Sequence, residues 1–158
     1  MSTKDSEIEL LKVTQQDTDF LYELIKEREK YPVEFRTPSS ELPTFREHEL
    51  FVNSFIENNN ENLYREWFII FLKNKLEEKK VGAIVLKKNG EWGYHILMKY
   101  WDQGIGTITA KKLFSMFQET KLWARVKPQN KRAIHQLEKL GFTLTSLTYE
   151  KTNYVKND

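Results

Sequence analysis

Two glycines, Gly104 and Gly106, are the residues whose spacing most directly indicates a binding site in this chain. They follow an apolar stretch and precede a segment with helical periodicity, so they predict a strand, a tight turn and a helix. Glycine lets the backbone approach a ligand closely, and the free N–H groups that begin a helix lie at the positive end of its dipole. The turn therefore predicts an anion site, with pyrophosphate as the expected ligand. A strand-to-helix corner without a ligand is the alternative.

Candidates for proton transfer lie just before this turn. Residues 91–98 form a predicted strand in which side chains alternate, so Glu91 and His95 share one face. A carboxylate or an imidazole can take a proton from a reacting amine, and Glu91 is the leading candidate for this base. Tyr149 and Tyr154 are lesser candidates for a proton donor.

Three further side chains, Arg36, Arg46 and His48, lie where a proline-rich loop leads into a helix. Guanidinium and imidazole groups can hold an anionic substrate, so we expect substrate contacts here. Surface positions on a capped helix are the alternative.

Composition excludes several classes of function. The chain has no cysteine, and its three histidines have no zinc-ligand spacing, so no metal site is expected. The net charge is only +2, with acidic and basic residues intermixed, which argues against nucleic acid as a partner. No apolar run approaches membrane-spanning length, and the polar N-terminus favours a cytoplasmic location. The length of 158 residues suits one domain over 1–158, as a monomer or homodimer.

The elements that must position these residues follow from hydrophobic periodicity and turn signals. Apolar positions repeat at helical spacing in some segments and alternate in others, and Asn89-Gly90 is a hairpin signal. This order predicts a single α/β domain. The expected elements are a strand at 8–13, helices at 17–28 and 44–58, strands at 67–72, 81–87 and 91–98, a helix from 105 to about 119, a strand at 122–126, a helix at 130–141, and strands at 142–147 and 148–155.

Two segments carry a specific resemblance. The run Met-Lys-Tyr-Trp-Asp-Gln-Gly-Ile-Gly-Thr at 98–107, followed by the segment 126–142 that ends in Lys-Leu-Gly-Phe, resembles the two signature motifs of the GNAT superfamily of acyl-CoA-dependent N-acyltransferases. The element order is similar across nearly the whole chain, and the helix-rich first half and the Tyr-Trp before the turn resemble the ribosomal-protein and amino-sugar acetyltransferase branch. The resemblance implies a GNAT fold, with a mixed, mostly antiparallel sheet of about six to seven strands and about four helices.

The same resemblance implies acetyl-CoA as the co-substrate. Backbone groups of Met98 and Tyr100 would pair with the pantetheine arm, and Asn130 would contact the pantetheine or the acetyl end. The pyrophosphate would be held by the amides of Gln103, Gly104, Ile105, Gly106 and Thr107.

The chain departs from the family pattern at two positions. Trp101 replaces the usual Gln or Arg of the turn, which leaves main-chain phosphate donors in place. Leu137 replaces the Tyr that protonates the leaving thiolate. Because the coenzyme A thiol has a pKa near that of a free cysteine, its thiolate can leave without a dedicated acid.

The predicted function is therefore transfer of an acetyl group to a primary amine, on a protein N-terminus, an amino sugar or another small molecule. Direct attack is expected, because the chain offers no cysteine and no nucleophile–base pair of readable spacing. One alternative is a GNAT-fold module that binds acetyl-CoA without turnover. Another is an unrelated nucleotide-binding domain, which the missing P-loop and dinucleotide fingerprints make a weaker hypothesis.

Overall fold

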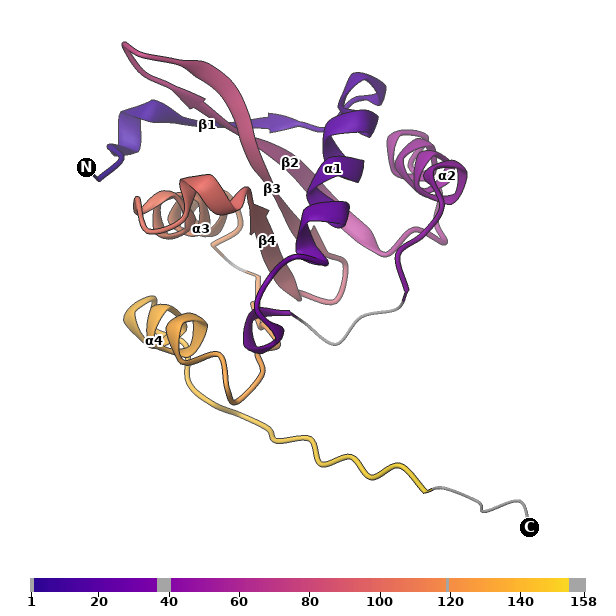
Figure 1. Cartoon of the computed structure of the whole chain (residues 1–158), viewed down its shortest axis with the longest axis vertical. Helices are drawn as coiled ribbons and strands as arrows, with labels where there is room; N and C mark the ends of the chain where they lie inside the picture. Colours follow the sequence, from indigo (N-terminus) through magenta and orange to yellow (C-terminus); the bar gives the residue numbers. More distant parts are fainter. Residues whose placement is uncertain (1, 37–40, 119, 154–158) are drawn as a thin grey trace.

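The computed structural model of the protein describes residues 2–36, 41–118 and 120–153. Its centre is a single antiparallel sheet in the order β1-β2-β3-β4, so β4 lies at one edge (Figure 1). The strands are β1 (Ile8–Lys12), β2 (Tyr64–Lys73), β3 (Glu78–Lys87) and β4 (Trp92–Ile96).

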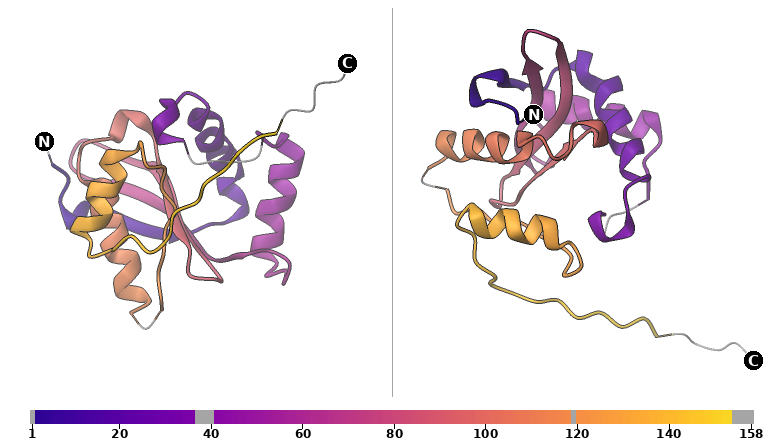
Figure 2. Two further views of the ribbon diagram at one scale, coloured as in Figure 1. Left: turned by 90° about the horizontal axis from the view of Figure 1, so that it is seen from below. Right: turned by 60° about the vertical axis from the view of Figure 1, so that its left-hand side comes forward.

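Helices cover both faces of this sheet. Figure 2 shows α1 and α2 on the side opposite to α3 and α4. The α helices are α1 (Thr18–Arg28), α2 (Phe45–Ile56), α3 (Ile105–Met116) and α4 (Lys131–Lys139), and short 3-10 turns occupy Asp5–Glu7, Gln15–Asp17, Val33–Phe35 and Met98–Tyr100. The α/β class and the four predicted helices are confirmed.

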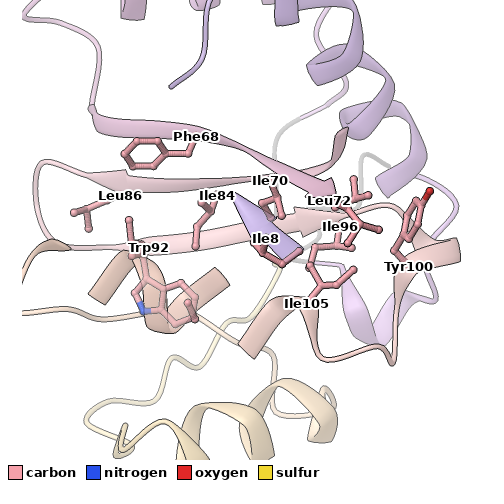
Figure 3. Packing of buried hydrophobic residues seen from close by; sticks show 13 residues of the cluster. Ile8, Phe68, Ile70, Leu72, Ile84, Leu86, Trp92, Ile96, Tyr100 and Ile105 are labelled. Carbon is pink, nitrogen blue, oxygen red and sulfur yellow. The ribbon is translucent and has the colours of Figure 1, made fainter. Parts of the chain in front are cut away.

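Strand β2 explains why the core has two layers. Four consecutive residues, Trp67 to Ile70, are buried, as expected for a strand covered on both faces. Phe68 and Ile70 point into the layer under α3 (Figure 3), whereas Trp67 and Ile69 pack with residues of α1 and α2. The apolar run therefore encodes a central strand, as predicted.

The orientation of β4 follows from its pairing with β3. Leu97 N–H donates to the Val81 carbonyl (2.8 Å), and Lys87 N–H donates to the Glu91 carbonyl (2.7 Å). Since hydrogen-bonded pairs recur at every second residue, the odd-numbered residues of β4 bond to β3, and the even-numbered ones direct their backbone groups to the outer edge. Trp92 and Ile96 side chains enter the layer under α3 (Figure 3).

The expected mixed sheet of six to seven strands is wrong, because the described residues form four strands, all antiparallel. Residues 122–126 make one isolated parallel bridge, between Glu91 and Trp123, and then leave the sheet. Residues 142–153 form no strand and run away from the sheet beyond α4 (Figure 1), and the rest of the predicted strand 148–155 lies outside the described residues. A segment with high strand propensity forms a strand only where a neighbouring strand offers backbone hydrogen-bond partners.

Two absences can be stated for the described part of the chain. No helix there is long and apolar enough to cross a membrane. No group of three His, Cys, Asp or Glu side chains comes together there as it would around a metal ion.

Candidate active site

The turn between β4 and α3 has the backbone geometry of an anion site. Gly104 is the N-cap of α3 with φ of 81°, and Asp102 is also left-handed, with φ of 64°. A Cβ atom at Gly104 would meet nothing within 4 Å. The first amides of α3 lack partners inside the helix, so they face this open space as free donors.

Gly106 is constrained by the protein itself. A Cβ atom at this position would lie 2.5 Å from the Tyr94 hydroxyl and 2.7 Å from the ring carbon that carries it. The close approach that requires glycine here is therefore between α3 and the Tyr94 side chain of β4.

Helix α4 is fastened to the same turn. The Tyr94 hydroxyl donates to Gln136 Oε1 (2.6 Å), and Gln136 Nε2 donates to the Thr107 hydroxyl (3.3 Å). Arg132 pairs with Asp102 (2.8 Å). These contacts join β4, the start of α3 and the side of α4 that faces the turn into one unit.

The outer edge of β4 is occupied by a backbone neighbour only at its start. Trp92 N–H donates to the Trp123 carbonyl (3.0 Å), and Trp123 N–H donates to the Gly90 carbonyl (3.1 Å). No further bridge to residues 122–126 follows in the described part of the chain. The edge at Tyr94 is therefore available to an extended ligand that adds to the sheet like a strand.

Side chains close the far end of this edge. The Ile96 carbonyl accepts from the Tyr31 hydroxyl (3.1 Å) and from Trp101 Nε1 (2.8 Å). Met98 N–H, predicted to pair with pantetheine, donates to Glu27 Oε1 at 2.6 Å. Glu27 thus stands where the cofactor arm was expected, and neither this carboxylate nor Tyr31 was anticipated from the sequence.

Tyr100 and Ile105, two other predicted cofactor residues, point their side chains into the core. Tyr100 N–H donates to the Leu97 carbonyl (2.9 Å), and its hydroxyl donates to Glu77 (3.1 Å). The amide expected to pair with pantetheine at Tyr100 is therefore engaged in the 3-10 turn, while Ile105 remains placed to offer its backbone N–H.

Gln103 and Asn130 also have internal partners. The Gln103 carbonyl accepts from Thr3 N–H (2.8 Å), which ties the N-terminal segment to the turn. Asn130 is the N-cap of α4, since its Oδ1 accepts from Ala133 N–H (3.1 Å). In the Asn130 side chain, the NH₂ group has no partner among the described residues and can contact a ligand.

Glu91 is held by two cations. One carboxylate oxygen pairs with Lys87 and the other with Arg125 Nε (2.8 Å), and the residue is buried. Burial alone would raise its pKa, but the hydrogen bonds from Lys87 and Arg125 outweigh it, so the pKa lies below its ordinary value. A carboxylate with both oxygens paired is a weak base.

His95 lies within β4 opposite Ala83 of β3, whose side chain packs in the layer under α1 and α2. Burial, with a smaller contribution from the positive charge of Arg28, lowers its pKa to about 4. The imidazole is therefore neutral at pH 7 and keeps a lone pair.

The three predicted substrate contacts have structural partners. His48 is only 2% exposed, and its Nε2 lies 3.0 Å from the Thr18 carbonyl between α1 and α2. Arg36 donates to the carbonyls of Tyr31 (2.7 Å) and Glu29 (2.5 Å), and Arg46 pairs with Glu49. These contacts account for all three side chains without a substrate.

The predicted proton donors are not brought to the turn. Tyr149 is 91% exposed on the segment that runs away from the sheet, and Tyr154 lies outside the described residues. Leu137 packs against the core under α3, as an apolar residue should. Two shallow surface hollows, of about 360 and 430 Å³, involve none of these residues.

The comparisons with known proteins decide the family. The model of the acetyltransferase (GNAT) domain matches residues 7–143. The chain belongs to the GNAT acetyltransferase family. Members of this family use acetyl-CoA, so this GNAT protein is an acetyl-CoA-dependent N-acetyltransferase, as the motifs predicted.

Solved structures share the GNAT fold at low sequence identity. A domain from Methanocaldococcus jannaschii DSM 2661 is 22% identical, with a TM-score of 0.72 and coverage of 90% of this chain and 92% of that one. Spermidine N-acetyltransferase from Vibrio cholerae, in complex with CoA and spermine, is 17% identical (TM-score 0.71; 89% and 83% covered). Ribosomal-protein-S5-alanine acetyltransferase from Vibrio fischeri is 16% identical (TM-score 0.65; 90% and 83% covered). No curated protein sequence matches this chain.

Proposed function

We propose that this protein transfers the acetyl group of acetyl-CoA to a primary amine by direct attack, at the open edge of β4. The observation that carries the proposal is the continuity of this edge with the Gly104 turn. An extended arm can pair with one while a pyrophosphate sits at the other. The whole of 1–158 would act as one GNAT domain.

The cofactor would run from the turn along β4. The amides of Ile105, Gly106 and Thr107 would hold the pyrophosphate, because they are unpartnered within α3 and lie at its positive end. The pantetheine arm would then pair with the outward backbone groups of Tyr94 in β4 and with the predicted Met98, while the Ile96 carbonyl keeps its bonds from Tyr31 and Trp101. Binding at Met98 requires Glu27 to release that amide.

The amine would approach from the α1 face of β4, where His95 lies. An ammonium has no lone pair for attack on the thioester, so a proton must leave. We assign this proton to neutral His95 rather than to Glu91, whose two oxygens are already paired with Lys87 and Arg125. The thiolate would leave without an internal acid, since its pKa is close to that of a free thiol.

Two kinds of primary amine are candidate acceptors. The solved relatives named above include a spermidine and a ribosomal-protein acetyltransferase, so both a small amine and a protein N-terminus are candidates for this chain. The cytoplasmic location and the oligomeric state stay predictions.

Two measurements on the purified protein test the proposal. Calorimetry should detect acetyl-CoA binding, and release of free coenzyme A in the presence of an amine library should report transfer. Tight binding without release for any amine would favour the alternative, a GNAT-fold binding module without turnover. Absence of binding would contradict both.

A further inference from the structure

We propose that the Thr107 hydroxyl donates a hydrogen bond to the pyrophosphate of acetyl-CoA, and that Tyr94 and Gln136 are positioning residues that direct its proton toward this ligand. This side-chain donor would join the backbone amides of the turn. The inference rests on the proposed function, because it concerns the same anion site.

Thr107 lies in the first turn of α3, just after the N-cap Gly104. Side chains of a helix tilt toward its N-terminus, so the Thr107 hydroxyl lies beside the amides that the helix leaves free. Within the described residues, its oxygen accepts a hydrogen bond from Gln136 Nε2 (3.3 Å), and its proton has no acceptor. The proton is therefore available to an anion at the turn.

Gln136 of α4 makes one hydrogen bond as an acceptor and one as a donor. Its Oε1 accepts from the Tyr94 hydroxyl of β4 (2.6 Å), while its Nε2 donates to Thr107. Because an amide carries its oxygen on one side and its NH₂ on the other, the bond from Tyr94 fixes which of the two faces Thr107. Gln136 is thereby held as a donor, which leaves the Thr107 proton to point away from α4.

Tyr94 is suited to hold this orientation. Burial raises the pKa of its hydroxyl, so Tyr94 keeps its proton at pH 7 and stays a donor. Its hydroxyl also lies against Gly106, where a Cβ atom would come within 2.5 Å of it. The side chains of Tyr94, Gln136 and Thr107 therefore form a chain of hydrogen bonds in which each group donates toward the turn.

One carboxylate, that of Asp102, belongs to the turn and would repel a pyrophosphate. Arg132 of α4 pairs with it (2.8 Å) and also lies over the Trp101 ring, 5.3 Å from its centroid. Asp102 therefore does not leave an uncompensated negative charge beside the anion site.

A double-mutant cycle on acetyl-CoA affinity, measured by calorimetry, tests this inference. Thr107→Val removes the hydroxyl at nearly constant volume and should weaken binding about tenfold or more, since a hydrogen bond to a charged group is worth at least that factor. Thr107→Ser keeps the hydroxyl and should bind with nearly wild-type affinity. Gln136→Met should weaken binding by a smaller factor, and it should have no effect in the Thr107→Val background, because Gln136 acts on the ligand only through Thr107.

Thr109 provides a matched control on the same helix. It is fully buried, and its hydroxyl has no hydrogen-bond partner among the residues that the structure describes. Thr109→Val therefore removes an equivalent hydroxyl from α3 and should leave acetyl-CoA affinity unchanged. Circular dichroism checks that each variant folds, and Thr107→Ala takes the place of Thr107→Val in the cycle if the latter does not.

Phosphorus NMR of bound coenzyme A gives a readout that a loss of packing would not reproduce. The resonances of the pyrophosphate should differ between the wild type and Thr107→Val, because one of its hydrogen bonds is lost. The resonance of the ribose phosphate, which this hydroxyl does not contact, should stay in place. A pyrophosphate spectrum that does not change would overturn the inference.

Three affinity results would also overturn the inference while the wild-type protein still binds acetyl-CoA. They are an unchanged affinity in folded Thr107→Val, an equal loss in Thr109→Val, and an effect of Gln136→Met that persists without the Thr107 hydroxyl. A gain in affinity for Gln136→Met would likewise overturn it, since Gln136 would then be withdrawing the Thr107 proton from the ligand. Absence of acetyl-CoA binding to the wild type would instead contradict the proposed function, and this inference with it.

Discussion

A Cβ atom at residue 104 would meet no protein atom within 4 Å, whereas one at residue 106 would collide with Tyr94. Both positions are glycine, but only the first has space that a ligand can fill. Gly104 also has a positive φ, so its substitution would combine backbone strain with damage to the ligand site. A control with equal strain is therefore needed.

Gly141 offers this control, because it has φ of 91° and an equally open surrounding at the end of α4. Gly104→Val and Gly141→Val should each lower the free energy of unfolding by roughly 1–2 kcal/mol through left-handed strain. Only Gly104→Val should weaken acetyl-CoA binding, by about 1.5–3 kcal/mol for each amide hydrogen bond that the pyrophosphate can no longer accept. Calorimetry on both variants checks this. Unchanged affinity in a folded Gly104→Val protein would refute a cofactor site at the turn.

The depressed pKa of His95 predicts a loss of stability in acid. Unfolding restores its ordinary pKa near 6.5, against about 4 in the folded protein. The unfolded state thus binds the proton first, and stability present above pH 6.5 is lost as the pH falls toward 4. His95→Gln should flatten the dependence of the unfolding temperature on pH in this window.

His48 provides the matched control for function. Burial also lowers its pKa, so His48→Gln should likewise flatten the stability profile in acid. Only His95→Gln should reduce acetyl transfer at pH 7, by roughly 10²-fold, the low end for a general base because a group of such low pKa is a weak one. Equal kinetic effects of the two variants would remove His95 from the mechanism.

At the scale of elements, Glu91 joins β3 to the segment that follows α3. Its carboxylate holds Lys87 at the end of β3 and Arg125 in residues 122–126, at the single bridge where that segment touches the sheet. The ion pair of Glu91 with Arg125 explains why Trp123 stays beside the start of β4, while the residues after it leave the sheet.

Glu91→Gln should therefore loosen this junction. We expect the free energy of unfolding to fall by about 1–3 kcal/mol, as for loss of charged hydrogen bonds, with faster hydrogen exchange at Trp123. Glu78→Gln, which breaks an exposed pair with Lys73, should cost no more than about 1 kcal/mol. Turnover should fall by less than the 10²–10⁴ expected for a lost base. Full stability with a turnover loss of that size would instead support Glu91 as the base, as the sequence predicted.

At the scale of the whole molecule, one sheet carries both parts of the candidate site. The turn and α4 belong to the layer under α3, and His95, which lies opposite Ala83 of β3, belongs to the layer under α1, with β4 between them. Cofactor binding should therefore stabilise the chain as one cooperative unit.

Thermal unfolding tests this expectation. Acetyl-CoA at about 100 times its Kd should add about 2.7 kcal/mol and raise the midpoint of a single transition by roughly 5–10 °C. Gly104→Val should show a smaller rise at the same concentration. Two transitions, of which the cofactor moves only one, would contradict a single domain over 1–158.

Local sequence patterns were sufficient to predict much of the structure of this protein. Periodicity placed the four helices and the buried strand β2, and the spacing of Gly104 and Gly106 marked the turn, because these features depend on residues within a few positions of one another. Alternation predicted Glu91 and His95 on one face of a strand, but only His95 lies within β4, and Glu91 directly precedes it. The two motifs identified the family, which the comparison over residues 7–143 confirms.

Only the tertiary structure decided strand pairing and side-chain surroundings. Residues 122–126 and 142–153 have strand-like sequences, yet a strand exists only where a neighbour supplies hydrogen bonds, and here four strands form instead of six or seven. Glu91 is a paired anion through Lys87 and Arg125, and His95 has a lowered pKa through burial, with a smaller contribution from Arg28. Arg125 and Arg28 are distant from these residues in sequence. A pKa depends on charge and burial in space, and no spacing along the chain records these.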